Sequence, residues 1–278
     1  MNAVVAGFGS IGARHARVLE ELGCRVTVVS RRGEVTSVAS VAGKADYIVV
    51  ANETSEHCNT VREIAATGFE GTVLVEKPLF DAPEDVPDHR FEHAYVGYNM
   101  RFHPLTQQLR EFAMGEQLLT AHAYVGQHLT TWRPGSDYRQ SYSASRARGG
   151  GVLRDLSHEI DTLRWLLGDL TLAGAAGGHF SSLEIDSDDV FALLMKGERC
   201  PVATLQMNYV DRRTRRELML VAERDTLHAD YVAAKVDRDY TYREMHRAAL
   251  AGDDSRLASF ADGMAVLRLI EEAEKSTE

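Results

Sequence analysis

The sequence is poor in positive charge, in cysteine and in long apolar runs, and each shortage excludes a class of protein. It has 31 lysine and arginine residues against 41 aspartate and glutamate residues, a formal net charge of −10 at pH 7. Nucleic acids and anionic membranes bind basic surfaces. We therefore expect neither a nucleic-acid partner nor a membrane partner, although a local basic pocket for a phosphate remains compatible with this charge.

The three cysteines do not form the pattern of a disulfide framework or of a metal site. Cys24, Cys58 and Cys200 are neither dense nor spaced as metal ligands. No apolar run reaches the roughly 20 residues that span a bilayer, and the first residues read as a strand. We expect reduced thiols and a cytoplasmic location.

The 278 residues suit two modest domains, and 44% apolar residues are ordinary for a folded chain. Strand and helix patterns alternate up to about residue 118. From residue 119, several segments alternate polar with apolar residues, as in a sheet with one exposed face, and a closing amphipathic helix follows. We predict a Rossmann domain, an α/β doubly wound parallel sheet, over residues 1–118. An α+β domain is predicted over residues 119–278.

A glycine turn near the start has the spacing of a dinucleotide site. The small, β-branched run "NAVVA" leads into Gly7, Gly9 and Gly12, and apolar residues at helical spacing follow. Gly7 permits a tight turn, Gly9 lets a diphosphate approach the backbone, and Gly12 lets helix and strand pack closely. We expect Ser10 and Ile11 to contact the cofactor as well. A purely structural glycine turn is the alternative.

The second strand pattern, "RVTVVS", ends where such a site selects its dinucleotide. Arg31 and Arg32 follow Ser30, whereas an NAD enzyme usually carries an Asp or Glu here. Two guanidiniums beside a hydroxyl suit a 2′-phosphate through charge-assisted hydrogen bonds. The residues favour NADP over NAD. Solvated surface arginines are the alternative.

More polar residues follow the next strand patterns. Too few residues precede "DYIVVAN" for a full crossover helix plus another long strand, so we expect the third Rossmann strand to be stunted or missing. Ligands bind at the carboxyl edge of such sheets. We predict cofactor contacts there from Ala51, Asn52, Thr54 and His57, although His57 fits equally well as a packed polar residue.

The segment "VLVEKPLF" brings Glu76 and Lys77 to the same edge. Pro78 biases Lys77 towards an extended backbone, which aims its ammonium. The four other lysines lie in segments typical of solvated turns or tails. Lys77 is therefore a candidate catalytic group, and a structural ion pair with Glu76 is the alternative. The next strand pattern, "HAYVGYN", ends at Tyr98 and Asn99.

The segment "RARGGGVLRDLSHEIDTLRWLLGD" is the richest in chemistry. Its three glycines suggest a flexible lead-in, and Asp155, His158 and Asp161 then follow at intervals of three, on one face of a helix. A carboxylate one turn from an imidazole can orient the ring for acid/base work. Metal binding is a rival, but no second His or Cys lies at ligand spacing, so we predict no metal. A helix cap by Asp155 is the structural alternative.

Taken together, "AGFGSIGARHAR", "ANETSEH", "VEKPL", "GYNMRFHP" and "GGGVLRDLSHEIDTLRWLLG" resemble the Gfo/Idh/MocA oxidoreductases in order and spacing. The segment "YRQSYSASRARGGG" is most similar to the corresponding segment of family members found with bacterial surface-sugar and nonulosonate biosynthesis. The resemblance implies a second domain with an open, mainly antiparallel sheet, whose outer face forms a homodimer or homotetramer. It also implies a carbohydrate-like substrate such as a sugar, amino sugar, nucleotide sugar or cyclitol.

The resemblance also implies roles for single residues. The catalytic set is Lys77, His158 and Asp155. Cofactor contacts extend to Glu76, Lys77 and Asn99, and substrate contacts to Tyr98, Arg101 and Asp161. The chain departs from the family pattern in three ways: Asp155 and His158 are one residue closer than usual, Glu53 replaces a proline, and the chain is shorter than many relatives.

These residues predict an NAD(P)-dependent dehydrogenase or reductase acting on CH–OH. When hydride leaves a carbinol carbon, the hydroxyl proton must leave too. We expect Lys77 to hydrogen-bond the reacting oxygen and His158, oriented by Asp155 or Asp161, to relay the proton. That mechanism requires Lys77 and His158 to converge over the nicotinamide ring. A non-catalytic NAD(P)-binding regulator, and a lyase or isomerase with transiently used nicotinamide, are the alternatives.

Overall fold

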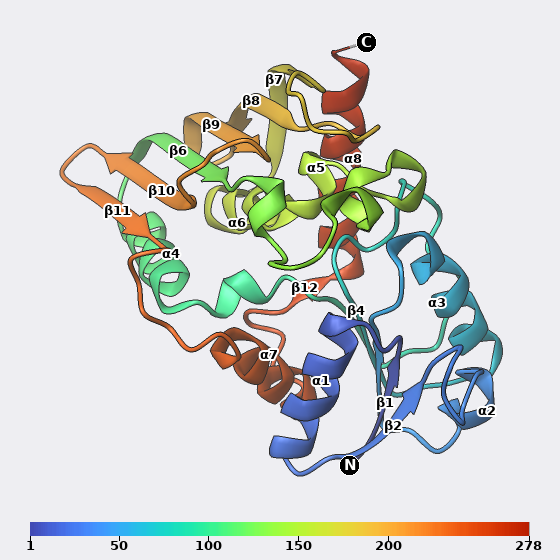
Figure 1. Cartoon of the computed structure of the whole chain (residues 1–278). Helices are drawn as coiled ribbons and strands as arrows, with labels where there is room; N and C mark the ends of the chain where they lie inside the picture. Colours follow the sequence, from blue (N-terminus) through green and yellow to red (C-terminus); the bar gives the residue numbers. More distant parts are fainter. Residues whose placement is uncertain (278) are drawn as a thin grey trace. The chain divides into compact units, whose positions relative to one another are not determined.

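The computed structural model describes residues 1–277 and divides into two compact units (Figure 1). The first unit comprises Met1–Phe102 and Asp237–Leu267, and the second comprises His103–Val236 and Arg268–Glu278. Residues 237–267 thus return to the first unit after the whole second sheet has been built. The boundary near residue 118 between a Rossmann domain and an α+β domain remains a prediction.

The first unit is a Rossmann-like, mostly parallel sheet of six strands in the order β12-β5-β4-β3-β1-β2. Its parallel strands are β1 (Asn2–Ala6), β2 (Arg25–Val29), β3 (Tyr47–Val50), β4 (Thr72–Val75) and β5 (His93–Val96), and β12 (Ala258–Ser259) is antiparallel. Only a four-residue helix, α2 (Ala39–Ala42), and one bridge from Val29 to Val35 lie between β2 and β3. The expectation that the third Rossmann strand is stunted or missing is confirmed.

Helices cover both faces of this sheet, which explains why its central strands are apolar throughout. Helix α1 (Ser10–Glu21) and helix α7 (Tyr240–Ala251) share one core with Val5, Tyr47 and Val49 of the sheet. Helix α3 (His57–Ala66) lies on the other side of the strands (Figure 1). The short 3₁₀ helices η1 (Thr54–Glu56) and η2 (Asn99–Phe102) complete the unit. The sequence patterns did not indicate α7.

The second unit is a mixed, mainly antiparallel sheet in the order β11-β10-β6-β9-β8-β7, in which β6 and β9 alone pair in parallel. Its strands are β6 (Leu118–Gly126), β7 (Leu170–Gly178), β8 (Val190–Gly197), β9 (Cys200–Asn208), β10 (Arg215–Ala222) and β11 (Thr226–Asp230). In β8, Phe191, Leu193 and Met195 are buried while Leu194 is exposed. The predicted sheet with one exposed face is therefore confirmed.

Helices cover the inner face of this second sheet. They are α4 (Pro104–Gly115), α5 (Val152–Asp155) and α6 (Ser157–Leu167), with four short 3₁₀ turns, η3 (Leu129–Thr131), η4 (Tyr138–Gln140), η5 (Tyr142–Ala144) and η6 (Arg146–Arg148). The closing helix α8 (Phe260–Lys275) is confirmed. Apolar side chains of α6, among them Ile160, Leu163 and Leu167, are fully buried.

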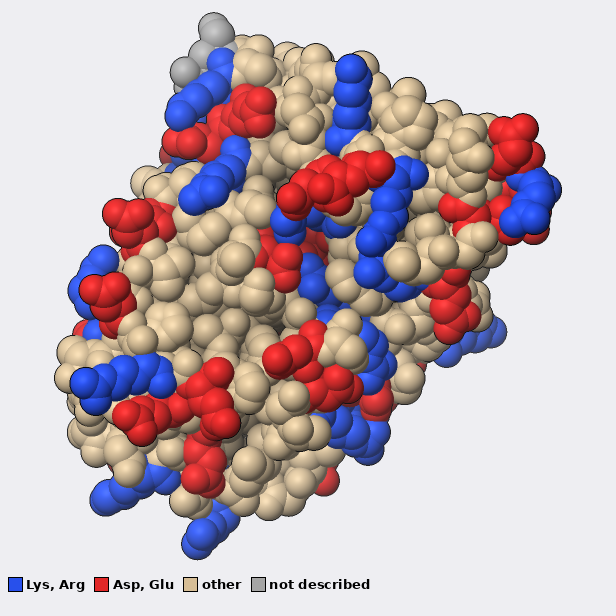
Figure 2. Space-filling view, turned by 180° about the vertical axis from the view of Figure 1, so that it is seen from behind, with Lys and Arg blue, Asp and Glu red and all other residues tan. Residues whose placement is uncertain are grey.

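Figure 2 shows acidic and basic side chains interspersed over one face of the molecule. Several surface charges are paired, such as Arg215 with Asp211 at 2.8 Å and Arg139 with Glu184 at 3.1 Å. Exposed pairs of this kind contribute only about 0–1 kcal/mol each. Within residues 1–277, no helix combines the length and apolarity that a bilayer crossing requires.

Candidate functional site

The glycine turn of the first unit is held closed by the neighbouring strand end. Gly7 has φ +109°, and a Cβ on it would lie 2.4 Å from the backbone nitrogen of Asn52. A Cβ on Gly12 would lie 2.0 Å from the carbonyl oxygen of Gly7. Both glycines are therefore required, because any larger residue would push helix α1 or the β3 end away from the turn.

Gly9 differs from these two glycines because the space beside it is open. A Cβ there would meet nothing within 4 Å, and Gly9, Ser10 and Phe8 are exposed. Gly9 is the N-cap of α1, and no side chain caps that helix. The first N–H groups of α1, including those of Ser10 and Ile11, thus form the anion-binding arrangement that a diphosphate uses.

The end of β2 carries the two arginines predicted to select the dinucleotide. The Arg31 side chain is 82% exposed and lies 3.5 Å from Glu56. The backbone N–H of Arg32 donates to the Ser30 hydroxyl oxygen over 3.3 Å. The guanidiniums are therefore exposed cations at the carboxyl end of β2, and Glu56 competes with an incoming anion for Arg31.

Two acceptor atoms near the end of β3 are buried and have no hydrogen-bond partner within residues 1–277: Asn52 Oδ1 and His57 Nε2. Asn52 Nδ2 donates to Thr60 over 2.8 Å. His57 Nδ1 lies 3.0 Å from the Pro78 carbonyl and 3.2 Å from that of Leu79, so Nδ1 carries the hydrogen and Nε2 is an acceptor. Burial lowers the pKa of His57, which favours this neutral form.

The Glu76–Lys77–Pro78 segment is built around a buried carboxylate. Glu76 is 8% exposed, and its Oε1 lies 2.8 Å from His15 Nε2, while its Oε2 accepts the Lys77 backbone N–H over 3.1 Å. A Cβ on Gly97 would lie 2.9 Å from Oε1, so Gly97 makes room for this carboxylate. Burial alone would raise the pKa of Glu76, but the His15 hydrogen bond and Lys77 outweigh it and leave the pKa below its ordinary value.

Lys77 is the only residue of the stretch 73–80 that is not buried. It follows directly after β4, and its peptide bond to Pro78 is cis. The Glu76 carboxylate, which accepts the Lys77 backbone N–H, and the two carbonyls bound by His57 hold the segment on both sides of Lys77. The structure thus presents one lysine from a closed, hydrogen-bonded loop at the same sheet edge as Gly9.

Residues after β5 are more enclosed than the sequence suggested. Tyr98 and Asn99 are buried, and Asn99 Nδ2 donates to Thr241 over 2.9 Å. Arg101 is 3% exposed, donates to the Leu257 carbonyl over 3.1 Å and lies 3.5 Å from Asp262. This guanidinium ties η2 to the return segment 237–267. The substrate contacts of Tyr98 and Arg101 remain predictions.

In the second unit, the expected single helix over Asp155, His158 and Asp161 is wrong. Helix α5 ends at Asp155 and α6 begins at Ser157, because Leu156 between them has φ −101° and ψ 23°. Asp155 accepts the Tyr209 hydroxyl over 2.6 Å. His158 lies half-buried in the first turn of α6, and Asp161 is fully buried.

The expectation of a flexible glycine segment before α5 is also wrong. A Cβ on Gly150 would lie 2.2 Å from the Tyr142 carbonyl, and one on Gly151, at φ +121°, would lie 2.2 Å from Asp188 Oδ1. Asp188 accepts the backbone N–H of Leu153 through Oδ2 over 3.1 Å. The glycines therefore permit close packing under a buried carboxylate whose pKa is raised by burial. Asp188 was not singled out from the sequence.

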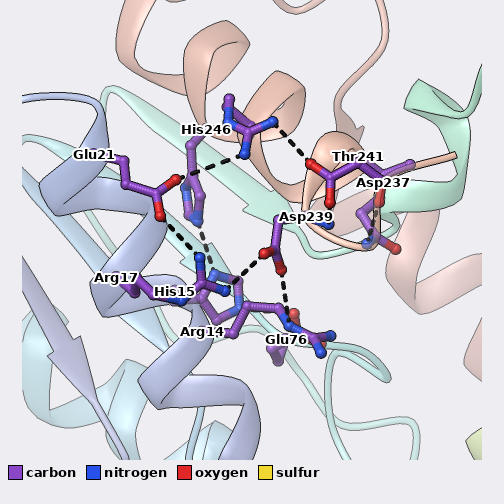
Figure 3. A network of polar contacts seen from close by, with 11 residues as sticks. Arg14, His15, Arg17, Glu21, Glu76, Asp237, Asp239, Thr241 and His246 are labelled. Carbon is purple, nitrogen blue, oxygen red and sulfur yellow. Dashed lines mark hydrogen bonds and ion pairs between the residues drawn. The ribbon is translucent and has the colours of Figure 1, made fainter.

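Lys77 and His158 belong to different units, so their convergence over one ring remains a prediction. The sequence reasoning also missed His15, which hydrogen-bonds to Glu76, and His246, which hydrogen-bonds to His15 (Figure 3). The signal for His15 was present: it occupies a position in the apolar stripe of α1, with Val18 and Leu19. A polar residue in an apolar stripe needs a buried partner.

Residues 107–228 match the GFO/IDH/MocA C-terminal domain. The chain is 30% identical over 181 residues to the rhizopine catabolism protein MocA of Rhizobium meliloti, which covers 58% of this chain and 54% of that protein. The chain thus spans about half the length of this curated relative.

Two solved structures share the fold. Levoglucosan dehydrogenase in complex with NADH has 15% identity and a TM-score of 0.84, with 100% of this chain and 98% of that chain covered. The WlbA dehydrogenase from Bordetella pertussis, in complex with NADH and UDP-GlcNAcA, has 17% identity and a TM-score of 0.83, with 99% and 96% covered.

Proposed function

We propose that the chain is an NAD(P)-dependent oxidoreductase of the Gfo/Idh/MocA family that transfers hydride between nicotinamide and a CH–OH carbon of a sugar-like substrate. The observation that carries this proposal lies within the first unit. The carboxyl edge of its sheet carries the uncapped N-terminus of α1 beside Gly9, where the space is open. The same edge carries Lys77, the one residue of the stretch 73–80 that is not buried. A dinucleotide site and a cationic hydrogen-bond donor at one edge suit a dehydrogenase.

The residues present fit a dinucleotide. Gly9 and the first N–H groups of α1 would hold the diphosphate, and Asn52 Oδ1 and His57 Nε2 offer buried acceptors to amide or hydroxyl hydrogens of the cofactor. Other predicted cofactor contacts are Ser10, Ile11, Gly7, Gly12, Ala51, Thr54, Glu76 and Asn99. When bound, the nicotinamide accepts or supplies the hydride.

We further propose that NADP(H) is preferred and NAD(H) is second. Arg31 and Arg32 are exposed cations beside the Ser30 hydroxyl, which suits a 2′-phosphate. The solved relatives described above hold NADH, so the ratio of affinities has to be measured on this chain. We expect Arg31→Ala with Arg32→Ala to weaken NADPH binding by about tenfold or more and to leave NADH binding within about twofold. Calorimetric titration of both cofactors checks this, and equal losses would contradict it.

The proton chemistry is proposed for this chain's own side chains. Lys77 donates a hydrogen bond to the reacting oxygen and stabilises the charge that develops there as hydride leaves the carbon. His158 takes the hydroxyl proton and passes it to solvent, and Asp155 and Asp161 lie on the neighbouring turns of the same segment. In the reverse direction the same groups return the proton to the new hydroxyl.

For the substrate we propose a sugar, amino sugar, nucleotide sugar or cyclitol. The relatives' names point to this class: one acts on levoglucosan and another is complexed with UDP-GlcNAcA. The chain's segments also resemble members found with surface-sugar and nonulosonate biosynthesis. Tyr98, Arg101 and Asp161 are the proposed substrate contacts, and all three are buried, so a substrate reaches them only if the packing around them changes.

We also propose a homodimer or homotetramer formed through the outer face of the second sheet. Leu194 of β8 and Val202 of β9 are 46% and 40% exposed there. Exposed apolar side chains on one sheet face are typical of a protein interface. Sedimentation of the full chain and of Leu194→Glu would measure the mass and its dependence on this face.

Lys77→Met tests the function. We expect nearly unchanged folding and NADPH affinity but a loss of about 10²- to 10³-fold or more in turnover, because one charge-stabilising donor is removed. NADPH and NADH are screened first by thermal shift, then nucleotide sugars and amino sugars, and turnover is followed by nicotinamide absorbance. The exposed Lys44→Met is the matched control. Near wild-type turnover in Lys77→Met would refute the role, and no net reduction of free NADP by any sugar would favour the regulator or the lyase.

A further inference from the structure

Four buried polar side chains of the first unit form one continuous hydrogen-bonded chain. Glu76 Oε1 lies 2.8 Å from His15 Nε2, His15 Nδ1 lies 2.8 Å from His246 Nε2, and His246 Nδ1 lies 2.9 Å from the Tyr47 hydroxyl. Figure 3 shows His246 of α7 reaching down to His15 of α1, with Glu76 beyond it. His15 and His246 have no exposed surface, and Tyr47 is 1% exposed.

This chain of hydrogen bonds runs from one edge of the sheet to the other. Tyr47 is the first residue of β3 and also lines a cavity of about 720 Å³ with Asp46, Thr72 and His93, where β3, β4 and β5 begin. Glu76 follows the last residue of β4, at the edge that carries Lys77. The hydrogen bonds therefore connect the amino-terminal edge of the sheet with the edge proposed for catalysis.

With no proton added, the hydrogen-bonded chain of four side chains has a single consistent placement of its hydrogens. The Glu76 carboxylate only accepts, so His15 donates from Nε2, and its Nδ1 must accept from His246 Nε2–H. His246 Nδ1 then accepts from the Tyr47 hydroxyl. In this state every donor points towards Glu76, both rings are neutral, and the four side chains together carry a charge of −1.

One added proton has an equally complete arrangement. A proton taken up by the Tyr47 oxygen lets the Tyr47 hydroxyl hydrogen pass to His246 Nδ1, and the hydrogen on His246 Nε2 passes to His15 Nδ1. His15 then donates to Glu76 and to His246, His246 donates from Nδ1 to Tyr47, and Tyr47 again carries one hydrogen. One proton enters, no hydrogen bond is lost, and the net charge becomes zero.

We propose that Tyr47 and His246 conduct a proton between the cavity and His15, the hydrogen-bond partner of Glu76, and so set the charge beside Lys77. The effect of this proton on catalysis rests on the proposed role of Lys77, whereas the conduction of the proton does not. His15 and His246 are positioning residues in this scheme, because they act on the reaction only through Glu76 and Lys77.

His246 and Tyr47 are placed to pass a proton on and not to keep it. Burial, and then His15, holds the pKa of His246 well below its ordinary value, so His246 passes a proton on rather than keeping it. Burial also raises the pKa of Tyr47 well above its ordinary value, so Tyr47 stays a hydroxyl. The other titratable or charged groups that face the chain are Tyr242, Arg14, Asp239, Lys77, His57, Cys24 and Tyr95.

Nitrogen-15 NMR of the histidine rings in the full chain tests the proposal. We expect His246 to carry hydrogen on Nε2 at high pH and on Nδ1 at low pH, because the added proton reverses the hydrogen bonds on both sides of its ring. His15→Gln is the decisive variant, because an amide can still donate to Glu76 and accept from His246 but takes up no proton. It should hold His246 in the Nε2–H form at every pH. His228→Gln, on exposed β11, should leave the change in place.

One tautomer of His246 at all pH values in the wild type, or the same change in His15→Gln, would overturn the proposal. Titration of the folded chains should show one proton fewer bound by His15→Gln. Lys77→Met should retain the NMR change, so a failed role for Lys77 is distinguished from a failed proton chain. In the active enzyme, His15→Gln should remove one ionisation from the pH profile of kcat, and an unchanged profile would overturn the link to Lys77.

Discussion

Glu76 in the first unit and Asp155 in the second are both buried carboxylates next to a candidate catalytic residue, but their partners differ. Glu76 is bound by an imidazole, behind which a second imidazole lies. Asp155 accepts the Tyr209 hydroxyl, and Tyr142 also hydrogen-bonds to it. Burial, and then Asp155, raises the pKa of both tyrosines well above the ordinary value.

This difference shows that the partners of a buried carboxylate decide whether it can exchange a proton. An imidazole accepts a proton at one nitrogen while it donates from the other, so it can relay one near neutral pH. A buried tyrosine at this pH keeps its hydrogen and only donates to the carboxylate. We therefore expect the Glu76 cluster to respond to pH and the Asp155 cluster to act as a fixed support for the helix break before His158.

The largest expected effect comes from Asp155→Ala. The change leaves the buried hydroxyl of Tyr209 and the hydroxyl of Tyr142 without their acceptor, which should lower the free energy of unfolding by about 2–4 kcal/mol. Urea unfolding followed by circular dichroism measures it. Asp169→Ala is the control, because the Asp169 side chain is 71% exposed and its loss should cost less than about 0.5 kcal/mol. A loss as small as that of the control would mean that Asp155 is not a support.

A second, smaller effect concerns the pH dependence of stability in the first unit. The folded pKa of His246 lies well below 6.5, so below that pH the unfolded chain binds a proton that the folded chain does not. Its contribution to stability is therefore complete above about pH 6.5 and falls by up to about 1.4 kcal/mol per pH unit below it. His246→Leu should unfold with a flatter dependence between about pH 6.5 and pH 5.

By the same reasoning, Glu76 does not contribute to the pH dependence of stability between about pH 6.5 and pH 5. Its folded pKa is lowered from 4.5, so its contribution is present above about pH 4.5 and is lost only as the pH falls through the folded value. Unfolding in urea at several pH values compares the wild type with His246→Leu. Parallel curves between pH 6.5 and pH 5 would show that His246 is not held neutral by burial.

The smallest effect is expected for Tyr209→Phe. The variant removes one donor from Asp155 and keeps the aromatic ring that packs edge-on against Trp132, so it should cost about 1 kcal/mol. Because the tyrosine does not titrate near neutral pH, the loss should be the same at pH 6 and pH 8. A loss that changes with pH would contradict the distinction between the two carboxylate clusters.

Local patterns were enough to predict much of the fold. The glycine turn, the apolar strands of the first sheet, the alternating strand β8 and the closing helix α8 each carry a short-range signal. Strand β7 was missed because "LTLAGAAGG" is small and glycine-rich, without alternation of polar and apolar residues. The break at Leu156 was missed because residues 152–167 keep helical spacing on both sides of it.

The sequence by itself determined the residue types at the proposed cofactor edge, because glycine spacing, strand ends and the Glu–Lys–Pro order are encoded within a few neighbours. Only the tertiary structure decided what surrounds Glu76. His15 lies 61 residues from it along the chain, and His246 lies 231 residues from His15. A hydrogen bond between buried groups depends on distances of a few tenths of an ångström, and a partner so remote in sequence is brought there by the packing of α7 on α1, which no local pattern records.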